Sequence, residues 1–239
     1  MIYLSSFKLS GRQICDPNIY PYSVFRGKYI DPFVFTPITV FYGNNGSGKS
    51  TLLNIIANKL GLKGKERATS NSYGITDYCD AFSSECSYSL GEDESGREIR
   101  YLPKNSRYIK SEDILYEVKK IQQRQVLSEG MLSDCVKSGM TKKDAEKYLK
   151  SKEGSDQMEY IMFAQEKYSN GETSLQYFDE FLQPGALYLL DEPEVSLSPA
   201  NQVALAEEIN KMARLLECQF IIATHSPFML GTLNAKIYN

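Results

Sequence analysis

Three runs of apolar residues along the chain have the pattern of buried strands. Ile38–Tyr42 is β-branched and aromatic, residues 186–190 are continuously apolar, and residues 220–223 repeat that pattern. Uninterrupted apolar runs of this length are typical of strands that are covered on both faces of a parallel sheet. The chain is therefore predicted to have an α/β fold with a parallel core.

Shorter segments of the first half have a different pattern. Residues 2–9, 20–25 and 33–35 are rich in aromatic side chains and are separated by prolines and glycines. This pattern predicts short strands of an antiparallel part. Residues 86–90 and 98–102 flank a cluster of turn residues and predict a surface hairpin.

Two parts of the chain have helical spacing. Residues 50–60 follow the first apolar run and place their apolar residues on one side. Farther along, Ser111 is a candidate helix start, and Thr141, followed three positions later by an acid, is a weaker one. The sequence predicts a single domain over residues 1–239, with a helical lobe at approximately residues 111–182 inserted in its core.

Composition narrows the classes of protein to which the chain can belong. It has 239 residues, 42% of them hydrophobic, a formal net charge of -3, one histidine and five cysteines. The odd, scattered cysteines indicate neither a disulfide framework nor a zinc site. No apolar run approaches the ~18 residues of a membrane helix, and no signal sequence opens the chain. We therefore expect a cytoplasmic protein without a membrane segment of its own.

Charge is unevenly distributed along the chain. Residues 104–152 contain twelve of the 27 Lys and Arg residues and only seven Asp and Glu residues. This basic stretch is a candidate nucleic-acid surface. The solvated faces of surface helices are an equally good explanation, and the negative overall charge supports that alternative.

The loop after the first apolar run has the spacing of a phosphate-binding loop, in which two glycines five positions apart are followed at once by Lys and a hydroxyl residue. Its members are Gly43, Asn44, Asn45, Gly46, Ser47, Gly48, Lys49 and Ser50, and Thr51 extends the hydroxyl-bearing helix start. The glycines let successive N–H groups point inward, where the positive end of the following helix adds to them. Lys49 is expected to reach the β- and γ-phosphates of a nucleotide, and Ser50 to bind Mg2+.

Polar residues follow the other two apolar runs at their carboxyl ends. Asp191 and Glu192 come directly after residues 186–190, and the single histidine, His225, comes shortly after residues 220–223. Ligands bind at this edge of open α/β sheets, and unpartnered carboxylates there are costly. A Mg2+ ion and an attacking water account for both acids, so Asp191 is a candidate metal ligand and Glu192 a candidate catalytic residue.

In combination, these motifs resemble those of the ABC-type ATPases. Residues 168–172 are similar to the signature of that family, whose usual core is Ser-Gly-Gly-Gln, although Asn and Glu here replace a Gly and the Gln. Residues 196–198 are similar to the D-loop of the family, and His225 is similar to its switch histidine. The resemblance covers residues 36–230 apart from a variable middle part.

Two branches of this superfamily compete. Transporter ATPases usually have an Asp directly after the switch histidine, and they have a Gln-containing loop. Here Ser226 and Pro227 follow the histidine, and no clear Gln-loop is present; its expected place is residues 108–113. Together with residues 191–199, these features resemble the RecF/SMC-like and overcoming-lysogenisation-defect-like ATPases of DNA repair, chromosome handling and phage defence, here without coiled-coil arms.

The resemblance implies an enzyme that hydrolyses ATP with Mg2+ as its cofactor. Ser50 and Asp191 would hold Mg2+. Glu192 would polarise the attacking water, and Lys49 and His225 would complete the catalytic set at the γ-phosphate. The implied fold is a P-loop NTPase with an ABC-ATPase-like head that has a mixed sheet, a parallel core and a helical lobe.

The same resemblance implies a homodimer that forms on ATP binding. Ser169 and Gly171 would contact the γ-phosphate that the second protomer holds. Such a dimer would act as a switch for an effector protein or for nucleic acid. Two alternatives stay open, namely a nucleotide-binding subunit of an ABC transporter and a nucleotide-sensing regulator with little turnover.

Overall fold

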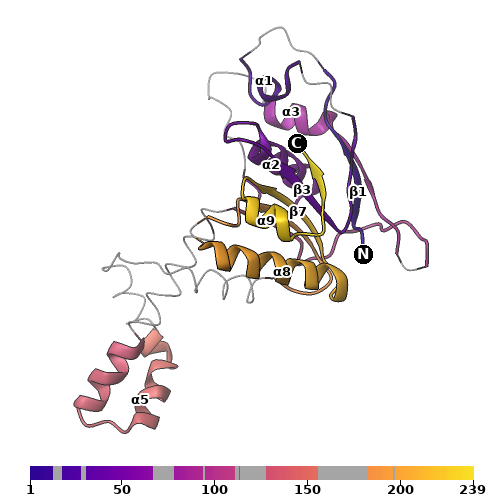
Figure 1. Cartoon of the computed structure of the whole chain (residues 1–239). Helices are drawn as coiled ribbons and strands as arrows, with labels where there is room; N and C mark the ends of the chain where they lie inside the picture. Colours follow the sequence, from indigo (N-terminus) through magenta and orange to yellow (C-terminus); the bar gives the residue numbers. More distant parts are fainter. Residues whose placement is uncertain are drawn as a thin grey trace. The chain divides into compact units, whose positions relative to one another are not determined.

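The computed structural model describes residues 1–12, 18–27, 31–66, 78–93, 95–110, 113, 128–155, 182–195 and 197–239. The chain divides into two compact units. The first consists of Met1–Ser111 with Leu182–Asn239, and the second is Glu112–Phe181. The first unit contains two sheets, and the second contains helix α5 (Lys142–Leu149) (Figure 1).

The core of the first unit is a five-stranded sheet in the order β5-β6-β7-β3-β8, and all neighbouring strands in it are parallel. Its strands are β3 (Ile38–Tyr42), β5 (Arg107–Lys110), β6 (Leu187–Asp191), β7 (Gln219–Thr224) and β8 (Lys236–Tyr238). Every residue of β6 and β7 is buried, as their continuous apolar pattern requires. The predicted parallel core is confirmed, and three of its strands lie where the apolar runs place them.

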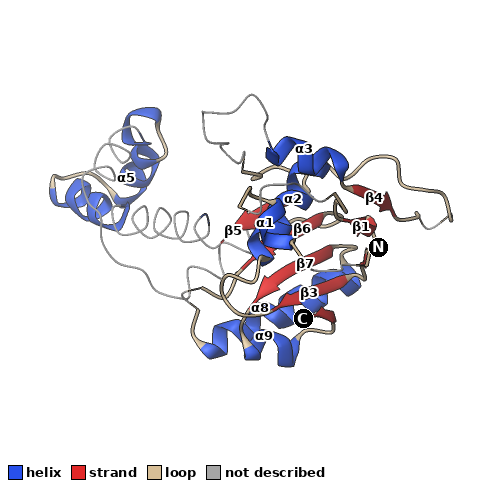
Figure 2. Ribbon diagram, turned by 90° about the horizontal axis from the view of Figure 1, so that it is seen from above, coloured by secondary structure: helices blue, strands red, loops and turns tan. Residues whose placement is uncertain are grey.

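Helices lie on both sides of this sheet. Helix α2 (Lys49–Leu60) follows β3 and packs beside α3 (Tyr78–Glu85), while α8 (Pro199–Leu215) and α9 (Pro227–Thr232) follow β6 and β7. In Figure 2, α2 lies on one side of the strands and α8 on the other. Because parallel strands end at the same edge, the residues that follow β3, β6 and β7 meet there.

Three further strands form a separate antiparallel sheet in the order β2-β1-β4. They are β1 (Leu4–Lys8), β2 (Phe33–Val34) and β4 (Ser87–Leu90). This sheet confirms the antiparallel part that the aromatic pattern predicts. The partner of β4 is β1, more than one helix away along the chain, so the register of this sheet is set by long-range pairing.

The side chain of Gln219, at the start of β7, joins the two sheets. Its Oε1 accepts hydrogen bonds from the backbone N–H groups of Tyr3 and Leu4, both at 2.8 Å. Its Nε2 donates to the carbonyl oxygens of Leu4 at 2.9 Å and Thr36 at 3.2 Å. This amide is fully buried and uses both its acceptor and its donors, as a buried polar group must.

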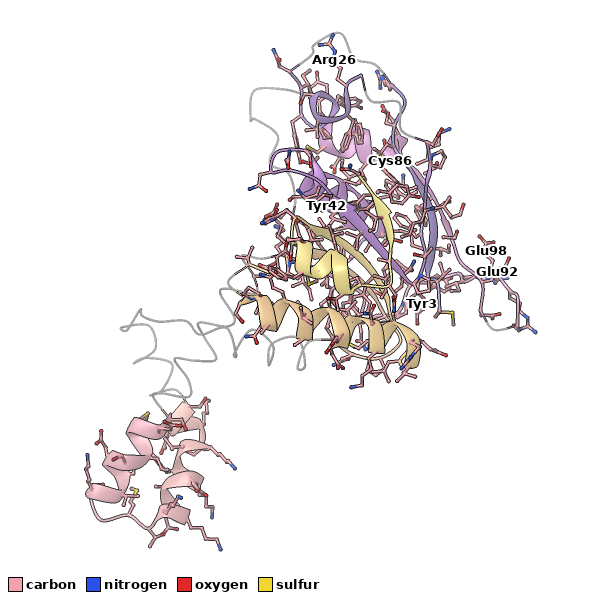
Figure 3. All side chains as sticks on the ribbon, in the orientation of Figure 1. Tyr3, Arg26, Tyr42, Cys86, Glu92 and Glu98 are labelled. Carbon is pink, nitrogen blue, oxygen red and sulfur yellow. The ribbon has the colours of Figure 1, made fainter. Side chains whose placement is uncertain are left out.

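The prediction of a second strand in the surface hairpin is wrong. Residues 98–102 form no strand; only Glu98 pairs, through an isolated bridge, with Glu92, and these two residues lie side by side in Figure 3. The turn between them is held by Asp93, whose carboxylate accepts from the N–H of Arg97 at 3.0 Å. Two backbone hydrogen bonds at 2.8 Å, from the Asp93 N–H to the Arg97 carbonyl and from the Ile99 N–H to the Gly91 carbonyl, flank the bridge, so the pairing is confined to the turn and its immediate neighbours.

One predicted strand is a helix. The aromatic pattern of residues 20–25 predicts an extended segment, but the short helix α1 (Tyr22–Phe25) forms instead. Tyr22 and Phe25 both pack on Phe82, with ring centroids at 4.8 and 5.7 Å. Residues three positions apart share one side of a helix, so burial of both rings against Phe82 outweighs their preference for a strand.

In the second unit, α5 begins at the predicted residue. The side-chain oxygen of Thr141 accepts a hydrogen bond from the N–H of Asp144 at 3.3 Å, which confirms this helix start. Ser111 and the predicted signature, residues 168–172 with Ser169 and Gly171, lie outside the described residues. Among the helices of the described part of the chain, none is long and apolar enough to cross a membrane.

Candidate functional site

The loop between β3 and α2 is shaped by the glycine that caps the helix. Gly48 has φ 97, a left-handed conformation that residues with a side chain rarely adopt. A Cβ atom at this position would lie 2.6 Å from Cγ1 of Val24 in α1. Only glycine fits, so α1 sets the path of the loop where it enters α2. The N–H groups of a first helical turn lack intrahelical partners and are a ready site for an anion.

Lys49 is held on the inner side of this loop. Its side chain is buried, and its Nζ donates to the carbonyl oxygens of Gly43 at 2.7 Å and Asn44 at 3.1 Å. An ammonium has three hydrogens, so two carbonyl partners leave one for a further acceptor. Residues 44–47 are exposed, and Thr51 is half-buried in the first turn of α2. The loop therefore combines a fixed cation with an open outer rim.

Asp191 is the point at which distant parts of the first unit meet. The Ser50 hydroxyl donates to its Oδ1 at 3.0 Å, although 141 positions separate the two residues. The Tyr108 hydroxyl donates to Oδ2 at 3.1 Å. Burial raises the pKa of Asp191 above its usual value, and these two hydrogen bonds oppose that rise. The structure thus brings together the two predicted metal ligands.

Tyr108 is a site residue that sequence reasoning missed. It lies on β5, which pairs in parallel with β6 so that Lys110 is opposite Asp191. Residues 108–113 are the expected place of the Gln-loop, and this was the feature of the sequence that could have pointed to Tyr108 as a site residue. What the sequence does not contain is the side-chain direction that brings the phenol to Asp191.

Glu192 follows β6 in a strained backbone conformation. Its φ is 47, which costs a non-glycine residue on the order of 1 to 3 kcal/mol. Its N–H donates to the carbonyl of Ala223 on β7 at 2.8 Å, which holds this turn in place. Its Oε1 lies 3.4 Å from Nδ1 of His225. The predicted base and the predicted switch histidine are therefore neighbours.

A second carboxylate, Glu194, lies beside His225. It is 4% exposed, and its Oε1 accepts from the Thr224 hydroxyl at 2.5 Å and from the backbone N–H of His225 at 3.1 Å. The same oxygen lies 3.5 Å from Nδ1 of His225. Sequence reasoning used Glu194 only as part of the segment that separates the two branches. The signal was its place two residues after Glu192, with a proline between them.

The turn after β7 is tied to the segment that precedes α8. The Ser226 hydroxyl donates to Oε1 of Gln202 at 2.6 Å, and Nε2 of Gln202 donates to the carbonyl of Leu197 at 3.0 Å. Ser198 caps α8. Gln202 therefore links Leu197 of the predicted D-loop to the turn that carries the histidine, whereas Ser196 lies outside the described residues.

The oxygen ligands near the loop fit a magnesium ion that binds together with phosphate. Ser50 supplies a hydroxyl and Asp191 a buried carboxylate, which are hard oxygen ligands. Mg2+ is usually bound by one or two carboxylates plus substrate phosphates. Within the described residues, no group of three or more His, Cys, Asp and Glu side chains is arranged to hold a metal. The site fits a cation whose remaining ligands come from a phosphate or from water.

A protein family matches most of the chain. The model of the family described as "AAA domain, putative AbiEii toxin, Type IV TA system" matches residues 80–231. This range contains Asp191, Glu192 and His225 and begins after the phosphate-binding loop. The comparison with curated proteins gave no match.

Several solved structures are similar to this chain. The Smc head domain of Pyrococcus furiosus, with an extended coiled coil and bound to the C-terminal domain of ScpA, is 16% identical, with a TM-score of 0.48 over 98% of this chain and 92% of that chain. The SMC head domain from Thermotoga maritima is 13% identical, with a TM-score of 0.42 over 98% and 93%. A nucleotide-free ATP-binding cassette from an ABC transporter is 13% identical, with a TM-score of 0.43 over 99% and 87%.

Proposed function

The chain belongs to the family described as "AAA domain, putative AbiEii toxin, Type IV TA system", a P-loop ATPase of the ABC type, and from this premise we propose that it binds ATP with Mg2+ and hydrolyses it. We further propose that ATP binding joins two copies of the chain and that hydrolysis separates them. The toxin and the TA system in the family description favour an effector protein as the partner that this switch controls.

The observation that carries the proposal is the hydrogen bond between Ser50 and Asp191. It joins the first turn of α2 to the end of β6 at 3.0 Å, beside the loop that holds Lys49. A hydroxyl and a carboxylate so placed are the protein ligands that a Mg2+ ion on a nucleotide phosphate requires. A purely structural turn has no need of a buried carboxylate at this position.

Each residue of the loop and of the sheet edge then has a separate task in phosphoryl transfer. Lys49 binds the β- and γ-phosphate oxygens as a point charge, and the N–H groups at the start of α2 bind them as dipoles. When bound, Mg2+ neutralises phosphate charge and orients the transferred group. Ser50 and Asp191 would hold it in place.

Glu192 and His225 act on the opposite side of the γ-phosphate in this proposal. Glu192 orients the attacking water and accepts its proton, and the strained backbone fixes where its carboxylate lies. His225 contacts the γ-phosphate oxygens as negative charge develops on them. Because β6 and β7 are neighbouring strands, the two side chains approach the same point from adjacent positions.

The proposed dimer follows from the expectation that two helix N-termini bind each nucleotide and that they come from different chains. The loop before Ser50 supplies one helix N-terminus in each chain, and the signature at residues 168–172 is predicted to open another. Two copies packed head to tail would place Ser169 and Gly171 of one chain at the nucleotide of the other. Such a pair is two-fold symmetric and contains two equivalent sites. ATP then acts as part of the interface, and its loss opens the pair.

Light scattering on a sizing column tests this function. A Glu192→Gln protein, which retains ATP, is expected to be a dimer with MgATP and to shift toward monomer without nucleotide. A Ser169→Arg protein is expected to stay monomeric while it still binds ATP, because the larger side chain blocks only the contact with the second copy. Phosphate release by the wild-type protein is measured alongside.

Three results would contradict the proposal. The absence of phosphate release from MgATP by the wild-type protein would exclude hydrolysis. The same oligomer in every sample, with or without ATP, would exclude the assigned role of the signature. A Ser169→Arg protein that dimerises and hydrolyses ATP normally would exclude it as well.

Nucleic acid is a second proposed partner, and α5 is the surface that favours it. Lys142, Lys143, Lys147 and Lys150 are all exposed on or beside this helix. Their replacement together by Gln is expected to weaken binding of DNA or RNA, because phosphate contacts supply most of the non-specific affinity. Fluorescence anisotropy over a series of salt concentrations measures this, and the slope of affinity against salt is expected to become shallower.

A matched variant controls for the change in net charge. It replaces four lysines that are exposed in the first unit and lie outside residues 104–152, namely Lys8, Lys63, Lys65 and Lys211. We expect this control to retain most of the affinity. Equal affinity of the wild-type protein and the α5 variant would show that the basic residues are only the solvated face of a helix.

A further inference from the structure

We propose that Glu194 is the residue that positions His225 for ATP hydrolysis. The catalytic part of this inference rests on the proposed function, whereas the positioning itself concerns the protein without nucleotide. Glu194 stands on the turn after β6, and His225 stands on the turn after β7. This task is one that neither Asp191 nor Glu192 performs.

The hydrogen bonds of Glu194 hold His225 and the residue directly before it. Its Oε1 accepts from the hydroxyl of Thr224, directly before His225, at 2.5 Å. It also accepts from the backbone N–H of His225 itself at 3.1 Å. A single carboxylate oxygen therefore fixes the backbone at the point where the histidine side chain leaves β7.

Two carboxylates lie near the same nitrogen of the His225 ring. Nδ1 of His225 is 3.4 Å from Oε1 of Glu192 and 3.5 Å from Oε1 of Glu194. Which ring nitrogen carries the proton is set by the partners of the other nitrogen, and two carboxylates favour a proton on Nδ1. Nε2 is then the nitrogen that is free to act on the γ-phosphate. The two acids differ in environment, since the Glu192 side chain is 25% exposed and that of Glu194 is 4% exposed.

The second oxygen of Glu194 indicates that this residue does more than accept hydrogen bonds from the Thr224 hydroxyl and the His225 N–H. Oε2 is buried, and among the described residues it has no hydrogen-bond partner. A neutral amide or hydroxyl would satisfy the same two donors without the cost of burying a charge. No Lys or Arg of the described part of the chain forms an ion pair with this carboxylate, and the ring of His225 is the basic group beside it. The interaction that favours a carboxylate at this position is therefore the one with the His225 ring.

The contacts of the neighbouring turn support the same role. The N–H of Ser226 donates to the Thr224 hydroxyl at 2.9 Å, so the oxygen that Glu194 binds also anchors the residue after His225. Glu194 therefore acts on the histidine through three consecutive residues. A displacement of the turn after β6 would move the ring with it.

Steady-state kinetics test the catalytic part in a double-mutant cycle. Glu194→Gln keeps an oxygen acceptor for Thr224 and is expected to fold. It should lower kcat by about 10- to 100-fold, the range found for partners that orient metal-binding histidines, and should leave KM for ATP nearly unchanged. In a His225→Ala protein the same replacement should have almost no further effect, because the residue acts through His225. Glu207→Gln, on the exposed side of α8, is the matched control and should behave as wild type.

The single histidine of the chain allows a second test that needs no enzyme activity. In a protein without a histidine tag, proton–nitrogen NMR signals of imidazole arise from His225 alone. Without nucleotide, the wild-type spectrum is expected to show the tautomer with the proton on Nδ1. Glu194→Gln should shift these signals and change the tautomer population, and Glu207→Gln should not.

The outcomes separate this inference from the proposed function. A wild-type protein that releases no phosphate would refute the proposed hydrolysis, and the NMR comparison would still decide whether Glu194 positions His225. Imidazole signals that coincide in wild type and Glu194→Gln would overturn the inference. An equal loss of kcat from Glu194→Gln with and without His225 would also overturn it.

Discussion

A Lys49→Ala protein will lose most or all of its affinity for MgATP. Lys49 is the cation on the inner side of the phosphate-binding loop, where two backbone carbonyls already orient its ammonium. Loss of one partner from a desolvated charge pair costs roughly 2 to 5 kcal/mol. At 1.4 kcal/mol per tenfold change, this is a loss of affinity of about 30- to 4,000-fold. Isothermal titration calorimetry with MgATP measures it.

Two further variants make this result specific to the charge. Lys49→Met keeps the length and apolar stem of the side chain and is expected to lose binding to the same extent. Lys59→Ala removes a lysine from the last turn of the same helix, where its Nζ contacts the carbonyl of Ser84, and should bind as wild type. Unchanged MgATP affinity in Lys49→Ala would remove the assignment of the loop.

A Glu192→Gln protein will bind ATP normally and hydrolyse it at least ~100-fold more slowly, the scale expected when a general base is lost. The amide keeps the shape of the side chain and its place beside His225, but it does not accept a proton from the attacking water. Phosphate release under single-turnover conditions measures the chemical step, and calorimetry shows whether binding is retained.

The control for the strained backbone is Glu217→Gln. Glu217 is the other non-glycine residue with a positive φ among the described residues, at 53, and it is exposed. It lies before β7, at the opposite end of that strand from His225, so its replacement should leave hydrolysis unchanged. A Glu192→Gln protein with the wild-type rate would show that another group accepts the proton.

The parts of the fold that sequence reasoning predicted are those whose pattern is local. β6 and β7 are buried over their whole length, so their sequences are continuous or nearly continuous apolar runs. The phosphate-binding loop is equally local, because the backbone path at Gly48 needs glycine at that position. The order of strand, loop and helix can therefore be predicted from the sequence, although Val24 of α1 also limits the space at Gly48.

The parts that it missed depend on contacts between distant segments. Helix α1 is set by Phe82, about sixty residues away, and the aromatic residues of α1 carry no sign of that partner. Tyr108 reaches Asp191 across 83 positions, and Glu194 reaches Thr224 across 30. Asp191 itself was predicted because it ends a buried strand. Its neighbours were not, because a strand pattern gives position along the chain but not the direction of each side chain.

The order of strands in the parallel sheet has a consequence for the nascent chain on the ribosome. Among the strands of the described residues, β3 pairs with β7 and β8, and its register partner for Ile38 is Phe220. The partner is made about 180 residues later, which at ~5 to 20 residues per second is about 10 to 40 s of translation. Throughout that interval the strand that leads into the phosphate-binding loop has neither of its neighbours. The nucleotide site is therefore completed late in synthesis, and a chain interrupted before β7 leaves an apolar strand with two open edges for chaperones to cover.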